Sequence, residues 1–508
     1  MSKAKDKAFF GHPVGLSTLF ASEMWERFSY YGMRALLVLF LTATYVNGGF
    51  ELAELDAFTI YGIFTAFVYV TPIIGGMLAD KVLGQRKCIY IGGITMATGQ
   101  FLLAASAMYQ GNPEIRKILF FAGLGTLILG NGFFKPNIST MVGQLYSNND
   151  PRKDGGFTIF YMGINIGAFL SPLVAGKLGE QVAWEYGFFS AGVGMLIGTT
   201  WFLLRSHTLE RIGMPPRSES SRIRLALHDW VNVMVYALGV VALVLGILLG
   251  WNSVQEDVRT WIIRIIVSAG ILYLLYDIVS GTNGKTEWSR VGVIVVLAVF
   301  NIFFWSGFEQ AGTTFNIFAR DNTRRLIGNW EIPASWFQSV NAIFIVLFAP
   351  MFSILWGKLD KVKLNPNTPM KFAWGMIALC LGFVIMAFAY TKSTGSPDGS
   401  ILKVSPLWLV SVFMLHTFGE LCLSPIGLSM VTKLSPPKIA STMMGLWMGS
   451  FAAGNFVASQ MKAISMSLQE TMNREVQVFW LIAIQSAIVA MILIILSPWL
   501  KRMMKGIK

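Results

Sequence analysis

Long apolar stretches, each bounded by charged or turn-forming residues, recur along the whole chain. Fourteen of them reach about twenty residues, the length that an α-helix needs to cross the hydrocarbon core of a bilayer. Hydrophobic residues make up 54% of the 508 and charged residues only 13%, far from the balance of a soluble protein. We therefore predict an all-α polytopic membrane protein embedded in a lipid bilayer. The predicted spans are roughly 16–46, 56–79, 88–109, 118–146, 155–176, 184–204, 225–251, 258–279, 291–319, 333–356, 372–390, 405–431, 440–464 and 476–496.

The distribution of basic residues predicts the orientation in the membrane. An even number of spans puts both termini on one side, and the loops on that side are richer in Lys and Arg than the opposite loops. By the positive-inside rule both termini are predicted to be cytoplasmic. The basic residues that give the net charge of +13 lie at the ends of apolar runs and do not form a basic face on a soluble domain. This pattern excludes nucleic-acid binding.

A long polar interval divides the chain. Residues 1–204 hold six spans and are predicted to form an N-terminal bundle, and 205–224 form a cytoplasmic linker. Two spans without central charges follow at 225–280 and are predicted to be an inserted scaffold, and 281–508 form the second six-helix bundle. Six plus six helices is the layout of major facilitator transporters, whose halves rock about a site near the midplane.

The loop between the second and third spans has a structural motif, Gly75-Gly76-Met-Leu-Ala-Asp80-Lys81-Val-Leu-Gly84-Gln-Arg86-Lys87. It resembles the signature loop of the major facilitator superfamily. Glycines allow tight packing at the end of a helix, and Asp80 can cap a neighbouring helix and pair with Arg86.

Four charges lie within the first span, where lipid tolerates none. Glu23, Glu26, Arg27 and Arg34, together with Tyr30 and Tyr31, fall on one side of a helix at 100° per residue. Ionisable groups at membrane depth are costly unless they face partners in a polar interior, so this face is predicted to be a functional site.

Three more charges lie deep in other spans, namely Lys135, Glu309 and Glu420. The basic groups without a local acid are in the N-terminal half, and the extra acids are in the C-terminal half. A zwitterion could bridge Arg27 and Lys135 to Glu420, and two or three extended residues span about 7–10 Å, which suits a cleft between bundles. Polar and aromatic candidates for the rest of the site are Tyr30, Tyr31, Tyr69, Tyr161, Asn165, Trp305, Asn341, Ser424 and Trp447.

Three motifs resemble those of the proton-dependent oligopeptide transporters, the POT or PTR2 family. Glu23-x-x-Glu26-Arg27-Phe28-x-Tyr30-Tyr31 is similar to their first-helix signature, and Phe160-Tyr161-Met-Gly-Ile-Asn165-Ile-Gly167 to their fifth. Phe418-Gly419-Glu420 through Ser424-Pro425-Ile-Gly427 is similar to their tenth. The two extra helices and the short loop from Thr391 to Val404 look like the bacterial branch. That resemblance implies a location in the bacterial cytoplasmic (inner) membrane. The resemblance implies import of di- and tripeptides by proton symport and alternating access.

The resemblance also implies roles for single residues. Arg27 and Lys135 would hold the peptide carboxylate, and Asn165, Asn341 and Glu420 would meet the amino terminus and backbone amides. The side-chain pockets would be lined by Tyr30, Tyr31, Tyr69, Tyr161, Trp305 and Trp447. Arg34 with Glu309 and Lys135 with Glu420 would form gating salt bridges.

Proton coupling is expected to use Glu23, Glu26, Arg27 and Glu309, because the histidine that animal relatives carry on their second helix is absent here. Protons would be the coupling ion, with no cofactor. Cys88, Cys380 and Cys422 have no spacing that suggests a metal site or a disulfide framework. His416, one turn before Glu420, is interpreted as a structural histidine or a modulator of Glu420.

Alternatives remain open at this stage. The same fold could carry a non-peptide solute such as nitrate, or a sensor could bind peptide without moving it. A membrane enzyme is disfavoured because no nucleophile–base pair or metal-ligand cluster is present, and no obligate protein partner is predicted. Side-chain preference, proton stoichiometry, the main proton-carrying carboxylate, the oligomeric state and the role of the inserted helices are not readable.

Overall fold

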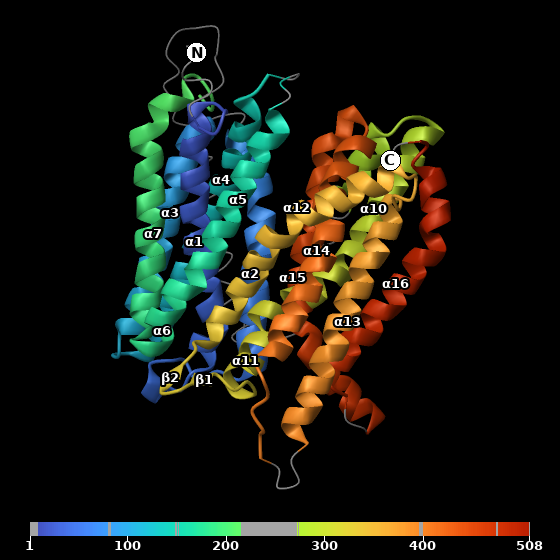
Figure 1. Ribbon diagram of the computed structural model, residues 1–508. Helices are drawn as coiled ribbons and strands as arrows, with labels where there is room; N and C mark the ends of the chain where they lie inside the picture. The colour runs from blue at the N-terminus through green and yellow to red at the C-terminus, as the bar shows by residue number, and fades with distance from the viewer. Residues whose placement is uncertain are drawn as a thin grey trace. The chain divides into compact units, whose positions relative to one another are not determined.

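A computed structural model describes residues 9–79, 83–147, 150, 152–214, 272, 274–395, 400–473 and 476–506 (Figure 1). Nearly all of these residues are helical. In the N-terminal half the elements are α1 (Val14–Thr42), η2 (Tyr45–Asn47), α2 (Glu54–Leu78), α3 (Gln85–Met108), α4 (Pro113–Gln144), α5 (Lys153–Ser171), η4 (Pro172–Gly176), α6 (Lys177–Gln181), α7 (Trp184–Arg205) and η5 (Ser206–Leu209). In the C-terminal half they are α10 (Gly284–Phe308), η6 (Glu309–Gly312), α11 (Thr314–Asp321), β1 (Leu326–Ile327), β2 (Trp330–Glu331), η7 (Ala334–Gln338), α12 (Ser339–Lys361), α13 (Thr368–Thr394), α14 (Leu407–Leu434), η8 (Pro437–Ile439), α15 (Ala440–Met472) and α16 (Val478–Met503).

Ten helical segments of the described residues are long and apolar enough to cross a membrane. Two further helices have the necessary length but a more polar composition. One is α1, with 29 residues and four charged side chains, and the other is α15, with 33 residues, many of them small or polar. The predicted all-α polytopic fold is therefore confirmed. The predicted count of fourteen is not confirmed, because the two predicted inserted spans fall mostly at 215–271, outside the described residues.

The helices group into two compact units. The first contains α1, α3, α4, α5 and α7, and the second contains α10 to α16. Helix α2 is divided between them: its residues Glu54–Ala66 belong to the second unit, and it belongs to the first from Phe67 onward. The predicted boundaries at 205–224 and 225–280 lie largely outside the described residues and stay a prediction.

Local sequence explains where some helices begin. Asn112 precedes Pro113 at the start of α4, and its side-chain oxygen accepts a hydrogen bond from the Glu114 N–H at 2.8 Å. Asn367 caps α13 in the same way, accepting from the Met370 N–H at 2.9 Å. Asparagine satisfies an orphan donor at a helix start, and proline just inside the helix has no N–H to satisfy.

Glycine contacts set the depth and rotation of α4 in the first unit. A Cβ on Gly99 of α3 would lie 2.9 Å from the Gly123 carbonyl oxygen, and one on Gly92 would lie 2.7 Å from the Gly130 carbonyl oxygen. Small residues let two membrane helices approach backbone to backbone, as α3 and α4 do here. Because Lys135 follows Gly130 on the same helix, this close contact fixes where Lys135 projects.

A matching contact positions Glu420 in the second unit. Gly375 of α13 faces Gly419 of α14, and a Cβ on either would lie 2.8–3.0 Å from the other's carbonyl oxygen. Glu420 directly follows this contact. Helix α10 ends at Phe308, and the tighter turn η6 that follows begins with Glu309, whose side chain is buried.

The signature loop is partly described. Gly84 has φ +76°, a backbone conformation that favours glycine, and it precedes α3. Arg86 donates from Nε to the Ile212 carbonyl at 2.7 Å and from Nη2 to the Glu210 carbonyl at 2.6 Å, so it holds the loop after α7. Asp80 lies outside the described residues, and its predicted pairing stays a prediction.

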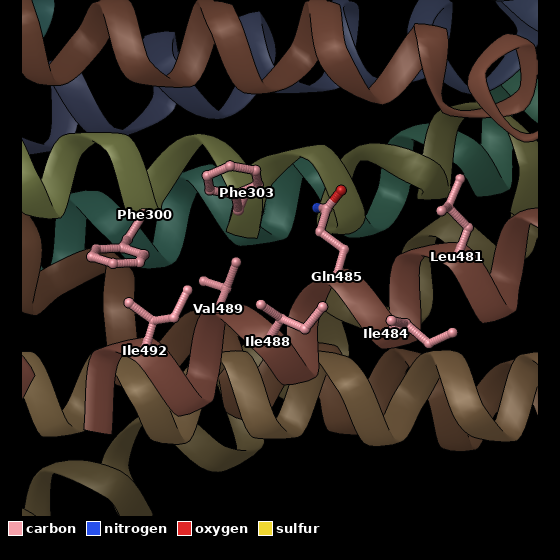
Figure 2. Close-up of a pocket in the computed structure, with 8 residues that line it drawn as sticks. All are labelled: Phe300, Phe303, Leu481, Ile484, Gln485, Ile488, Val489 and Ile492. Carbon is pink, nitrogen blue, oxygen red and sulfur yellow. The ribbon is translucent and has the colours of Figure 1, made fainter. Parts of the chain in front are cut away.

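A shallow groove on the surface of the second unit is apolar and is not suited to a charged ligand. Figure 2 shows its lining side chains from α10 and α16. Gln485 is its polar member, and its amide donates a hydrogen bond to Ser306 Oγ at 3.1 Å. The charged residues that the sequence singles out lie elsewhere. The lining residues are Phe300, Phe303, Leu481, Ile484, Gln485, Ile488, Val489 and Ile492.

Candidate substrate-binding and coupling site

The charged face of α1 is buried and internally paired. Arg27 Nε lies 2.7 Å from Glu23 Oε1 and 3.1 Å from Glu26 Oε2. Both glutamates are inaccessible to solvent, and Arg27 and Arg34 are nearly so. Two carboxylates thus share one guanidinium, and a buried charge imbalance of this kind is costly unless a proton or another cation compensates it.

Helix α4 supplies the next partners of this face. Asn131 donates its side-chain N–H to Glu26 Oε1 at 3.2 Å. One turn later, the Lys135 ammonium lies 4.0 Å from the centroid of the Tyr69 ring. The structure thus brings the predicted residues Lys135 and Tyr69 together. The sequence patterns assigned no role to Asn131, although its spacing of four residues from Lys135 places both side chains on one face of the helix.

The tyrosines of the first-helix signature pack on one another. The rings of Tyr30 and Tyr31 meet edge to face with centroids 5.4 Å apart, and the Arg34 guanidinium lies 5.7 Å from the centroid of Tyr31. Tyr30 is buried and Tyr31 half-buried. A cation over an aromatic face is held in place by the ring quadrupole, so Tyr31 restrains Arg34.

Helix α5 packs closely on α1 at Arg27. A Cβ on Gly167 would lie 2.9 Å from Arg27 Cβ and 3.0 Å from the Phe28 nitrogen. On the same helix, Asn165 is buried and donates to the carbonyl of Tyr161, whose side chain is 42% exposed. The fifth-helix motif therefore provides both the contact surface for Arg27 and two polar candidates.

In the second unit the structure joins Asn341 to Glu420. The Asn341 amide donates to Glu420 Oε2 at 3.1 Å and to Thr417 Oγ1 at 3.0 Å. Asn341, Glu420 and Ser424 are all half-buried. A carboxylate that accepts an amide hydrogen bond has a defined orientation, which is what recognition of an ammonium group requires.

Trp305 is held by a network that its sequence did not reveal. Its Nε1–H donates to Asn301 Oδ1 at 3.1 Å, and Asn301 donates to Ser450 Oγ at 2.7 Å. The ring packs on Phe451 with centroids 4.7 Å apart. Trp447 is fully buried beside Gly427 in this structure. Asn301 could have been suspected from its position one turn before Trp305, whereas Ser450 offers no sequence signal.

His416 sits among aromatic rings. Its ring lies 5.6 Å from Phe315 and 5.0 Å from Phe383, centroid to centroid, and a Cβ on Gly382 would reach the imidazole at 2.5 Å. Because the imidazole is buried and stacked among these rings, a packing role for His416 is favoured over modulation of Glu420.

The predicted gates, Arg34 with Glu309 and Lys135 with Glu420, each join residues of different units and stay predictions. No group of three or more His, Cys, Asp and Glu side chains that could hold a metal ion occurs among the residues that the structure describes.

Comparison with known proteins identifies the family. Residues 86–503 match the model of PTR2, the POT family. The chain belongs to the POT family. It is 39% identical over 513 residues to the peptide transporter YePEPT of Yersinia enterocolitica, with 98% of this chain and 97% of that one covered. It is 33% identical to the di-/tripeptide transporter of Lactococcus lactis subsp. cremoris, with 99% of each covered.

Solved structures agree with the fold. A crystal structure of a peptide transporter POT in complex with sulfate matches with a TM-score of 0.83 at 35% identity, covering all of both chains. A POT family transporter in complex with 5-aminolevulinic acid matches with a TM-score of 0.82 at 28% identity, covering 97% of this chain and 98% of that one. The predicted family and major facilitator fold are confirmed, and the chain is a multi-pass membrane protein of a transporter family, not of an enzyme family.

Proposed function

We propose that this protein imports di- and tripeptides across the bacterial cytoplasmic membrane by proton-coupled symport and alternating access, with both termini cytoplasmic. The observation that carries the proposal is the Glu23–Arg27–Glu26 cluster, which buries two carboxylates around one guanidinium within a spanning helix. The relatives from Yersinia and Lactococcus that carry peptide-transporter names support the substrate class. Protons are the coupling ion, and the proposal involves no cofactor or obligate protein partner.

The peptide is held by its two ends. Arg27 and Lys135 bind the carboxylate, because both are cations at membrane depth. Glu420, oriented by Asn341, binds the ammonium, and Asn165 meets the amino terminus and backbone amides. The side chains rest on aromatic and polar surfaces formed by Tyr30, Tyr31, Tyr69, Tyr161, Trp305, Ser424 and Trp447.

Proton coupling follows from the excess of carboxylates over cations. A proton on Glu23, Glu26 or Glu309 removes a buried negative charge and weakens its attraction for an arginine. Arg34 is then released from Glu309, and peptide competes for Lys135 and Glu420, so the two gates respond to proton and peptide in turn.

The test is uptake of labelled dipeptides and tripeptides into liposomes that contain the purified protein, with an imposed inward proton gradient. The unmodified protein should accumulate peptide above the external concentration only while the gradient lasts. Glu309→Gln should lose this accumulation. Glu114→Gln is the control, because Glu114 is exposed and pairs only with the surface residue Lys117 in the described residues.

Two results would overturn the proposal. If Glu309→Gln accumulates peptide like Glu114→Gln, Glu309 has no part in coupling. If the unmodified protein accumulates no peptide but takes up nitrate or another non-peptide solute, or binds peptide without moving it, the substrate class or the transport activity is wrong.

A further inference from the structure

Helix α16 presents one apolar face to the bilayer. It is the most apolar of the helical segments of the described residues that could span a membrane. Five large side chains, spaced three or four residues apart and each about half exposed or more, fall on one side of the helix. They are Ile484, Ile488, Met491, Ile495 and Trp499. A stripe of this kind is costly in water, so it lies against the acyl chains of lipids.

The groove of Figure 2 opens onto this face. Ile488 belongs both to the exposed stripe and to the groove, and Phe300 and Phe303 of α10 form the opposite wall. Gln485, the polar member of the lining, donates an amide N–H across to α10. The groove is therefore continuous with the lipid-facing surface, and its walls are almost entirely hydrocarbon.

The dimensions of the groove match one aliphatic chain. From Leu481 to Ile492 it follows α16 for about 16 Å, which is about the hydrocarbon depth of one leaflet. It encloses about 370 Å³, which over this length gives a mean cross-section of about 23 Å², or a width of about 5 Å. A chain whose carbon atoms lie about 4 Å from their neighbours fits this width, whereas an α-helix about 10 Å across does not.

The groove lies toward the uncharged end of α16. Leu481 is in the first turn of the helix, which begins at Val478, whereas Lys501 and Arg502 are in the last turn. Basic residues mark the cytoplasmic end of a span, so in the proposed orientation the groove lies in the outer leaflet.

We propose that this groove is a binding site for one acyl chain of a phospholipid in the outer leaflet. The ester end of the chain lies near Leu481, and its methyl end lies near Ile492. This inference goes beyond the proposed function and does not depend on which solute is transported.

The bound chain would support α10 from behind. At 100° per residue, Phe300 and Phe303 lie on nearly the opposite side of α10 from Asn301 and Trp305. Asn301 and Trp305 form the hydrogen-bonded network that reaches Ser450. An open slot behind α10 would forfeit dispersion contacts, and the chain supplies them.

The experiment is photo-crosslinking in liposomes of phosphatidylethanolamine that contain a trace of the same lipid with a diazirine in one chain. One probe carries the diazirine near the ester and the other near the methyl end, and labelled fragments are mapped by mass spectrometry. The first probe should label α16 near Leu481, and the second should label Ile492 and Phe300. Ile488→Trp fills the groove with its own side chain and should lower labelling of both walls at least several-fold. Ile495→Trp, the same substitution on the same helix outside the groove, is the matched control and should label like the unmodified protein.

A second measurement uses the melting temperature of the purified protein in detergent. Added phosphatidylethanolamine should raise the Tm of the unmodified protein and of Ile495→Trp, because a ligand that binds the folded state stabilises it. It should raise the Tm of Ile488→Trp less, since the groove of that variant is already filled.

Three results would overturn the inference. Equal labelling of Ile488→Trp and Ile495→Trp would mean that lipid covers α16 without a defined site. A reversed order of labelling by the two probes would mean that the chain comes from the other leaflet. A disulfide-linked dimer of Ile488→Cys in the membrane, without one for Ile495→Cys, would mean that a second copy of the chain fills the groove. Failure of peptide uptake would overturn the proposed function and leave this inference standing.

Discussion

The Asn301–Ser450 hydrogen bond between α10 and α15 allows a quantitative test of the second unit's core. Asn301→Leu keeps the volume nearly constant but leaves the Trp305 Nε1–H without its acceptor, which costs about 1–3 kcal/mol for a buried donor. The lost interhelical hydrogen bond adds about 0.6 kcal/mol, the average for membrane helices. We expect the free energy of unfolding to fall by about 2 kcal/mol.

Ser450→Ala breaks the same bond from the other side and strands the Asn301 amide, for an expected loss of about 1–2 kcal/mol. In the double variant both partners of the bond are gone and no Asn301 amide is stranded, so the total loss should stay at about 2 kcal/mol instead of reaching the sum of the two single losses. The measurement is reversible unfolding of the purified protein in mixed micelles by a denaturing detergent. The control is Asn301→Leu with Ser190→Ala, whose hydroxyl donates to the Gly187 carbonyl of its own helix and whose effect should simply add. Additivity within about 0.5 kcal/mol for Asn301 and Ser450 would refute the network.

Three other outcomes are expected. Arg116→Lys should lower the free energy of unfolding by about 2 kcal/mol, because a lysine cannot serve the three carbonyls that the buried guanidinium holds; an unchanged value in the same detergent titration would contradict this. Gly167→Ala should weaken dipeptide binding at equilibrium several-fold while the protein stays helical by circular dichroism. The new methyl group would overlap the Met24 carbonyl oxygen and push α5 away from α1 at Arg27; normal affinity would disprove the close contact. Hydrogen bonds from Arg152 hold the pKa of Asp150 below its ordinary value of 3.8, so this pair stabilises the fold above that value and the stabilisation is lost as pH falls through the lower, folded-state pKa. Asp150→Asn should therefore be less stable than the unmodified protein at neutral pH and equally stable in strong acid. A difference in stability that persists in strong acid would speak against the pair.

The length of the helices and the identity of the family were readable from local patterns. The hydrophobic length of a span and the 100° period of a helix depend only on nearby residues, so α1 and its charged face from Glu23 to Arg34 could be predicted directly. The same holds for Lys135, Glu309 and Glu420, because a charge in an apolar run is conspicuous in one dimension. Where the predicted spans differ from the helices, the differences are mostly a few residues at the ends, where polar side chains extend a helix beyond its apolar part.

Partners at long range were decided by the tertiary structure alone. Asn131 and Glu26 are 105 residues apart, and Asn301 and Ser450 are 149 apart, and nothing in their local sequence links them. Glycine contacts such as Gly92 with Gly130 set how helices slide and rotate against one another, and that geometry chooses which buried polar atoms meet. The sequence by itself therefore determined which residues need a partner, because an unpaired charge is costly at membrane depth. The packing of the helices determined which partner each residue has, because a hydrogen bond forms only within about 3 Å.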